Sequence, residues 1–178
     1  MSTQISGGRL RGQIVDTPDG EKTRPTSNKT RQALFNILGQ NFSGLILYDV
    51  YAGSGSVGFE ALSRGANKVV FVESSELVCQ IIQSNTLKFE LGPQVQIINN
   101  SANDFFKSFL EGAVEDNTIL FLDPPFDIVF PDLGYIVAQK NRFDSIVIQY
   151  PTSLKANWLK SASKIKKYGV SSLAIFES

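Results

Sequence analysis

Five short apolar segments, alternating with stretches of helical character, constrain this fold more than any other feature of the chain. The segments are LILYDV (45–50), KVVFVE (68–73), VQIINN (95–100), TILFLD (118–123) and SIVIQY (145–150). Strands that alternate with helices predict a parallel, doubly wound sheet covered by helices on both faces. The intervening helices are expected after a glycine-rich turn that ends near 58, over about 75–90, near 103–111 and near 131–140.

The two ends of the chain depart from this alternation. SKIKKYG (163–169) and SSLAIFES (171–178) are too close in sequence for a crossover helix, so they should pair as an antiparallel hairpin. Residues 4–16 are expected to form a short hairpin with a Gly-Gly turn, and 26–40 a helix. The sequence therefore predicts an α/β, Rossmann-like fold with a seven-stranded, mostly parallel sheet that ends in an antiparallel hairpin.

Composition narrows the class of protein. Hydrophobic residues make up 42% of the 178 residues and charged residues 19%, as in ordinary globular proteins. No run of 18 apolar residues predicts a membrane span, and the start MSTQISGG does not resemble a secretory signal. The lone Cys79 cannot form an internal disulfide, which fits a cytoplasmic protein. We also expect the protein to be a monomer, because no long apolar stripe is left over in the sequence. Without histidine, we expect neither a metal site nor Ser–His or Cys–His catalysis.

The net charge is zero, but the charges are unevenly distributed. Residues 1–40 hold six Lys/Arg against three acids, 41–154 six against thirteen, and 155–178 five against one. An acidic body between two basic ends favours a bound cation in the middle and polyanion contact at the edges, although solvated charged faces are the alternative. The shift in composition divides the chain into an N-terminal extension, 1–41, and a main domain, 42–178.

The stretch DVYAGSGSVG (49–58) contains a nucleotide-binding pattern. Its glycines have the G-x-G-x-x-G spacing between a strand and a helix, and Glu73 ends the next strand, where an acid can bind ribose hydroxyls. Taken alone, this pattern indicates NAD, or a tight turn that needs glycine only for its backbone shape. However, Asp49 would repel a pyrophosphate and attract the ammonium and sulfonium groups of S-adenosylmethionine.

The remaining cofactor assignments follow from position along the chain. Tyr51 and Ala52 lie in the glycine turn and are expected to line the cofactor site. The third strand ends at NNSAND (99–104), where Ser101 and Ala102 are placed to meet the adenine edge.

The fourth strand stops on an unusual tetrapeptide, Asp123-Pro124-Pro125-Phe126. Prolines cannot continue a central strand, and the carboxyl end of a strand in this kind of sheet faces the ligand crevice. The Asp123 carboxylate and the Pro124 carbonyl can accept the two hydrogens of an exocyclic amine and aim its lone pair at a methyl group. Pro125 would fix the turn and Phe126 would stack on the base; alternatively, the prolines only end the strand and Phe126 packs in the core.

Several stretches together resemble the bacterial family that methylates N2 of one guanine in 16S ribosomal RNA. They are ISGGRLRG (5–12), TRPTSNKTRQALFNIL (23–38), DVYAGSGSVGFEALSRGA (49–66), FVE (71–73), DPPF (123–126) and KKYGVSSLAIFE (166–177). The resemblance implies a class I methyltransferase fold that uses S-adenosylmethionine and an N-terminal extension that grips RNA. The implied substrate is 16S ribosomal RNA within a small-subunit assembly intermediate.

The resemblance also implies roles for individual residues. Asp49, Gly53 and Gly55 would bind the methionine end of the cofactor, and Glu73 its ribose. Asp123, Pro124 and Phe126 would hold the guanine. The implied RNA or substrate contacts are Arg9, Arg11, Arg24 and Arg31.

Three other readings of the sequence remain open. An adenine-N6 methyltransferase acting on RNA or DNA would also carry such a tetrapeptide, although Asn is more usual than Asp at its first position. An NAD-dependent dehydrogenase and a binding module without catalysis are the other two. The C-terminal lysines could contact RNA or form a solvated face; they are Lys155, Lys160, Lys164, Lys166 and Lys167.

Overall fold

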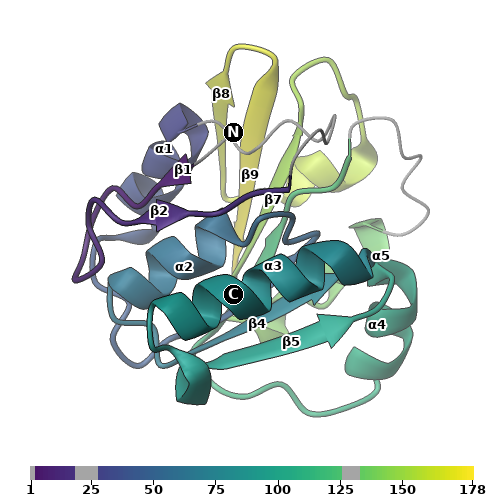
Figure 1. The fold of residues 1–178 in the computed structure, drawn as a ribbon. Helices are drawn as coiled ribbons and strands as arrows, with labels where there is room; N and C mark the ends of the chain where they lie inside the picture. The colour runs from purple at the N-terminus through teal and green to yellow at the C-terminus, as the bar shows by residue number, and fades with distance from the viewer. Residues whose placement is uncertain (1–2, 19–27, 126–132) are drawn as a thin grey trace.

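A seven-stranded sheet forms the centre of the computed structural model, which describes residues 3–18, 28–125 and 133–178 (Figure 1). The strand order is β5-β4-β3-β6-β7-β9-β8. The strands are β3 (Ile46–Val50), β4 (Lys68–Glu73), β5 (Val95–Asn99), β6 (Thr118–Leu122), β7 (Ser145–Pro151), β8 (Lys164–Tyr168) and β9 (Ser171–Glu177). The first five are parallel, and β9 is antiparallel to both β7 and β8. The predicted sheet and its C-terminal hairpin are thus confirmed.

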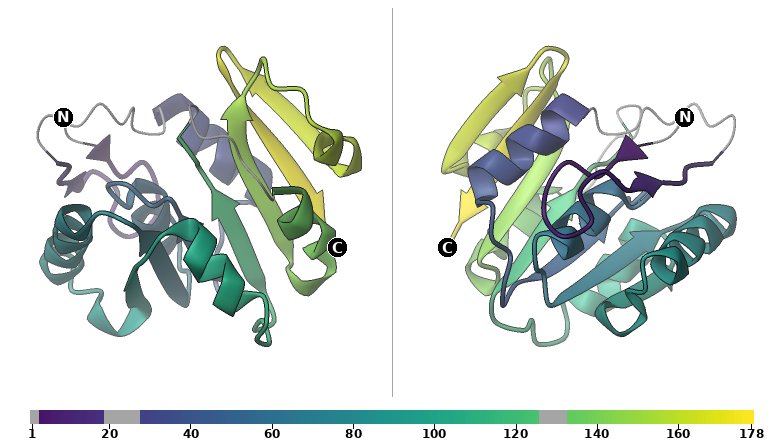
Figure 2. Two further views of the ribbon diagram at one scale, coloured as in Figure 1. Left: turned by 90° about the vertical axis from the view of Figure 1, so that its right-hand side faces the viewer. Right: turned by 60° about the vertical axis from the view of Figure 1, so that its left-hand side comes forward.

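Helices cover both faces of this sheet (Figure 2). The α-helices are α1 (Asn28–Leu38), α2 (Ser56–Ser63), α3 (Glu76–Lys88), α4 (Ala102–Phe109) and α5 (Leu133–Ala138), and the short 3-10 helices are η1 (Gly92–Gln94), η2 (Lys140–Arg142) and η3 (Asn157–Ser161). Within the described parts of the chain, none is both long and apolar enough to cross a lipid bilayer.

Alternation of side chains along the strands builds the two cores. In β4, Phe71 packs with the apolar residues of α1, α2 and α3, whereas Val70 and Val72 pack with those of α4 and α5. Both kinds of position are fully buried, which explains why the parallel strands read as continuous apolar runs.

The N-terminal hairpin differs in detail from its prediction. β1 (Thr3–Gln4) and β2 (Ile14–Val15) pair antiparallel as expected, but the chain between them is a wide loop instead of a tight Gly-Gly turn. Gly8 lies against the end of α2, and a Cβ atom there would lie 1.9 Å from the Ser63 carbonyl oxygen. This glycine is therefore required by close backbone approach, which turn chemistry alone does not reveal.

The N-terminal extension shares the core of the main domain. Ile5 and Val15 from the hairpin, and Leu34 and Phe35 from α1, belong to the same apolar cluster as Val147 of β7. Residues 3–18 and α1 therefore cover the sheet and do not form a separate hydrophobic core.

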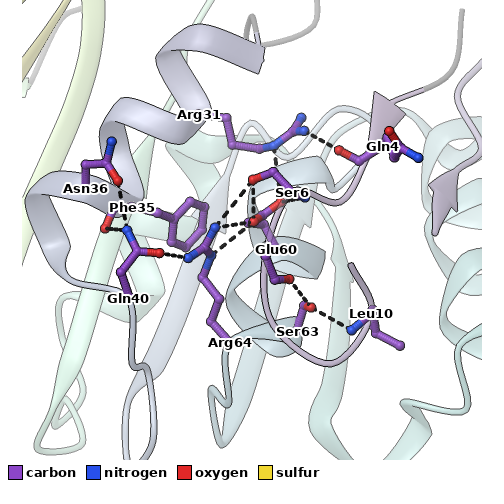
Figure 3. Close-up of polar contacts among 11 residues, drawn as sticks. Gln4, Ser6, Leu10, Arg31, Phe35, Asn36, Gln40, Glu60, Ser63 and Arg64 are labelled. Atoms are coloured by element: carbon purple, nitrogen blue, oxygen red, sulfur yellow. Dashed lines mark hydrogen bonds and ion pairs between the residues drawn. The ribbon is translucent and has the colours of Figure 1, made fainter. Parts of the chain in front are cut away.

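One buried carboxylate fixes this extension in place (Figure 3). Glu60 of α2 is fully buried and accepts hydrogen bonds from the Ser6 amide and hydroxyl, both at 2.8 Å. It also accepts from Arg64 Nε at 3.0 Å and Nη2 at 2.6 Å, and its Oε2 lies 3.6 Å from Arg31 Nε. Arg31 in turn donates to the Gln4 carbonyl at 2.6 Å. Glu60 thereby joins the N-terminal loop, α1 and α2.

Replacing this carboxylate should strongly destabilise the fold. Glu60→Ala would leave the Arg31 guanidinium buried without its charge partner, so the free energy of unfolding should fall by about 3–5 kcal/mol. Glu111→Ala, which removes an exposed carboxylate, is the control and should change stability by less than about 0.5 kcal/mol. Urea unfolding of both variants measures this, and equal midpoints would contradict the role given to Glu60.

Candidate functional site

The residues expected to bind the cofactor follow β3, β4, β5 and β6, four parallel strands that end on the same side of the sheet. Val50 of β3 pairs with Val72 of β4 and with Leu122 of β6, while Glu73 pairs with Asn99 of β5. The segments that follow these strands therefore leave the sheet at the same level, beside one another.

The glycine turn after β3 is held in an unusual backbone conformation. Tyr51, Gly53 and Gly55 all have positive φ angles, of 65°, 52° and 75°. The amides of Tyr51 and Ala52 both donate to the Val72 carbonyl, at 3.1 and 3.2 Å, and the Gly55 amide donates to the Ala52 carbonyl at 2.8 Å. The left-handed backbone conformation of Tyr51 costs free energy, and the hydrogen bonds to the Val72 carbonyl of β4 hold the turn in this conformation.

The three glycines of the motif serve two different purposes. A Cβ atom on Gly58 would lie 2.2 Å from the Phe71 ring, and one on Gly55 would lie 3.0 Å from Phe59 and Phe71, so both permit close packing of α2 on β4. A Cβ atom on Gly53 would meet nothing within 4 Å. Gly53 therefore borders open space, where a ligand can approach the backbone of the turn.

Glu73, the residue predicted to bind ribose, lies directly beside this turn. Its Oε2 accepts from the Gly53 amide at 3.0 Å, and its Oε1 accepts from the Ser75 amide at 2.9 Å and the Ser74 hydroxyl at 3.3 Å. Since each carboxylate oxygen can accept two hydrogen bonds, Oε2 retains capacity for a ligand hydroxyl.

Asp49 of β3 is buried and contacts the start of α2, the helix that follows the turn. Its Oδ2 accepts from the Gly58 amide at 2.9 Å in the first turn of α2, and the residue is only 1% exposed. Burial raises the pKa of Asp49 well above its usual range, nearby Asp123 and Glu73 raise it further, and the Gly58 hydrogen bond opposes them. The carboxyl group thus has almost no surface for direct contact with a ligand.

The start of α4 provides the residues expected near adenine. The Ser101 hydroxyl accepts from the Asp104 amide at 3.1 Å and donates to Asp104 Oδ2 at 2.8 Å, so it caps the helix and its one proton is already used. Ala102 is buried. Sequence reasoning gave no separate role to Asn99, whose Nδ2 donates to the carbonyls of Glu73 and Ser74 at 3.0 and 3.1 Å and fixes the turn after β4.

The predicted amine-binding segment leaves the sheet between β3 and β7. The Asp123 amide donates to the Val50 carbonyl at 3.3 Å, which joins the end of β6 to the end of β3. Asp123 is partly buried, Pro124 is buried and Pro125 is exposed, while Phe126 lies outside the described residues. In the described ranges, no group of three or more His, Cys, Asp or Glu side chains is arranged to hold a metal ion.

Two of the four arginines assigned to RNA lie far from this side of the sheet. Arg9 and Arg11 are exposed on the wide loop between β1 and β2. The Arg9 amide donates to the Ser63 carbonyl at 2.8 Å, and its Nη2 donates to Gln94 Oε1 at 3.3 Å. Because Ser63 ends α2 and Gln94 precedes β5, this loop lies at the amino-terminal ends of the parallel strands, opposite the residues predicted to bind the cofactor.

Arg31 requires a correction. The prediction placed it on an RNA-binding surface, but its side chain is 1% exposed and interacts with Glu60 and the Gln4 carbonyl. Burial lowers the pKa of Arg31, which the Glu60 carboxylate partly offsets. Arg31 is therefore a structural residue in this fold. Arg24 lies outside the described residues.

Comparison with known proteins agrees with this architecture. A family model described as Conserved hypothetical protein 95 matches residues 3–177. The chain is 39% identical over 125 residues to a Ribosomal RNA small subunit methyltransferase D of Haemophilus influenzae and 35% over 123 residues to one of Escherichia coli K12. Each alignment covers 69% of this chain and 63% or 60% of the relative, so the chain spans less than two thirds of their length.

A solved structure extends the comparison to almost the whole fold. The structure of yhhF from Escherichia coli is 26% identical and superposes with a TM-score of 0.79, covering 99% of this chain and 98% of that one. The likeness includes the N-terminal extension and the C-terminal hairpin, since so little of either chain is left unmatched.

Asp49→Asn should make stability less dependent on pH. Because the pKa of Asp49 is raised in the folded state, that state holds more protons than the unfolded one above the ordinary value of 3.8, and the stability of the unchanged protein falls as the pH rises. An uncharged Asn avoids this penalty and can still accept from Gly58. In the ligand-free protein, denaturant titrations at several pH values should show the stability of the variant relative to the unchanged protein increasing above about pH 4. A constant difference between the two would contradict the assignment.

Proposed function

We propose, from the premise that the chain belongs to the family described as Conserved hypothetical protein 95, that it transfers a methyl group from S-adenosylmethionine to the N2 amine of a guanine in 16S ribosomal RNA. The observation that carries this proposal is the position of Asp123 and Pro124 beside the glycine turn. The Asp123 amide bonds to the Val50 carbonyl, so an amine acceptor and a cofactor turn adjoin at one sheet edge.

The chemistry of the edge fits S-adenosylmethionine better than a dinucleotide. Three carboxyl groups, those of Asp49, Glu73 and Asp123, lie near one another among the described residues around the turn, and a bound cation favours their ionised forms. Such an acidic site attracts a sulfonium and an ammonium and repels a pyrophosphate. Gly53 borders open space, and Glu73 retains a lone pair for a ribose hydroxyl. When bound, S-adenosylmethionine supplies the activated methyl group.

The protein's part in the reaction is to orient the acceptor amine. The lone pair of an exocyclic amine is delocalised into the base, so the amine is a weak nucleophile. The Asp123 carboxylate and the Pro124 carbonyl accept its two hydrogens, and this fixes the direction of the lone pair. Positioning of this kind can lower the barrier by several kcal/mol without a histidine base.

The relatives named Ribosomal RNA small subunit methyltransferase D support ribosomal RNA as the substrate. The N2 amine of guanine lies in the minor groove of a duplex, where a planar pocket cannot enclose it. The target guanine is therefore single-stranded or turned out of its helix, and we place it in a small-subunit assembly intermediate in the cytoplasm, bound by a monomer of this protein.

A product analysis tests the proposed reaction. Purified protein and radiolabelled S-adenosylmethionine are incubated with unmodified small-subunit particles, naked 16S ribosomal RNA or DNA, and the nucleic acid is digested to nucleosides. Label in N2-methylguanosine supports the proposal and ranks the substrates. Label in N6-methyladenosine instead would replace it with the adenine reaction, and no transfer to any of the three would refute it.

Asp123→Ala should separate catalysis from cofactor binding. Removing the amine acceptor should lower the rate of methyl transfer by about 10²–10⁴-fold, a typical effect for a positioned catalytic group. The dissociation constant of S-adenosylmethionine, measured by calorimetry, should stay within about threefold. Asp116→Ala, which removes an exposed carboxylate from the connection before β6, should retain full activity. Full turnover by Asp123→Ala would remove Asp123 from the mechanism.

A further inference from the structure

We propose that the lysines of β8 and of the connection before it bind the sugar–phosphate backbone of RNA next to the reacting guanine. The inference rests on the proposed function, because it assigns a substrate surface to the same site. The resemblance places the main RNA contact on the N-terminal arginine loop. The inference places it instead on β8, the last strand of the sheet, and on the chain before it.

The C-terminal lysines carry a positive charge that no acidic side chain among the described residues neutralises. These lysines are all exposed, and none forms an ion pair within the part of the chain that the structure describes; they are Lys155, Lys160, Lys164, Lys166 and Lys167. By contrast, Lys88 pairs with Asp16 and Lys107 with Asp104. Residues 155–178 contain Glu177 as their one acid. The lysines therefore present an unbalanced positive charge to a polyanion.

The topology brings this charge to the substrate side of the sheet. β7 runs parallel to β6, so it ends on the same side of the sheet as Asp123. β9 pairs antiparallel with β7, and β8 pairs antiparallel with β9. The turn between β8 and β9 lies on that side as well, because the Thr152 amide and hydroxyl donate to the carbonyls of Val170 and Gly169, both at 2.9 Å. Figure 2 shows the β8–β9 hairpin reaching beyond the end of β6.

The separation suits a contact a few nucleotides from the target base. Two strands, β7 and β9, lie between β6 and β8, so the lysine strand is three strand spacings, about 14 Å, from the end of β6. Arg9 and Arg11, in contrast, lie at the opposite edge of the sheet, beyond the length of α2. An RNA chain whose guanine lies beside Asp123 can therefore contact β8 without passing to the opposite end of the strands.

The lysines also project from both faces of the edge strand. Lys164 and Lys166 pair with Ile175 and Leu173, which belong to the core beneath α1, so they share that face. Lys167 pairs with Ser172 and projects from the other face. A backbone that passes along the open edge can thus be contacted from both sides, which a single flat face would not allow.

Edge strands often carry lysine for a different reason, since charge prevents two sheets from pairing edge to edge. That explanation accounts for charge on β8 but not for Lys155 and Lys160, which lie outside the strand. The two explanations predict different salt dependence of RNA binding, so binding experiments can decide between them.

The test compares two triple variants that remove the same charge. Lys164→Ala, Lys166→Ala and Lys167→Ala together remove the three proposed contacts on β8. The control combines Lys88→Ala, Lys107→Ala and Lys140→Ala, which lie on α3, α4 and η2. Binding of each protein to an unmodified 16S ribosomal RNA fragment is measured by fluorescence anisotropy at several salt concentrations, on samples shown to be monomeric and folded by light scattering and circular dichroism.

The β8 variant should bind the RNA at least tenfold more weakly at low salt. The slope of log K against log salt should become shallower by about 2, since each lost contact to single-stranded RNA is worth about 0.7. The control should keep the original slope, and Lys→Arg at the three β8 positions should restore it. An unchanged slope in the β8 variant would overturn the inference. If part of that variant aggregates, the slope is measured on the monomeric fraction and is judged in the same way. The proposed function stands or falls separately, on N2-methylguanosine formed by the unchanged protein.

Discussion

Two carboxyl groups accept hydrogen bonds from the glycine-rich segment that runs from β3 into α2, and the geometry of the whole site depends on that segment. Asp49 accepts from the Gly58 amide at the start of α2, and Glu73 accepts from the Gly53 amide within the turn. The Tyr51 backbone, in its left-handed conformation, is tied to β4 by the Val72 carbonyl. The open space beside Gly53 is therefore a fixed feature of the fold, bordered by acceptors on adjacent strands.

Helix α2 links this turn to the polar contacts that Glu60 makes with Ser6, Arg31 and Arg64. The helix begins at the glycine turn and carries Glu60, which binds the N-terminal loop through Ser6 and lies next to Arg31 of α1. The N-terminal extension is thus anchored to the same helix whose first turn supports the site. Loss of the Glu60 contacts would change the packing of α2 as well as the position of the extension (Figure 3).

Much of this architecture could be predicted from the sequence, because periodicity and motif spacing are local signals. The predicted parallel strands match the observed ones to within one residue at each end, and the glycine turn, Glu73 and Asp123 lie at one sheet edge as expected. The burial of Arg31 could not be predicted, since it depends on Glu60, 29 positions away, which the sequence does not mark as a partner. The same limit applies to Asp49, whose burial beneath α2 is a tertiary contact, and to the β8 lysines, whose position follows from strand order.

The most direct test of the account is a crystal structure of the protein with S-adenosylhomocysteine, the product of methyl transfer. The account predicts a ribose hydroxyl on Glu73 Oε2, the amino-acid end of the ligand beside Gly53, and its sulfur facing Asp123. A ligand bound at another edge of the sheet, or a crystal soaked at millimolar concentration with no ligand at Glu73, would contradict the account.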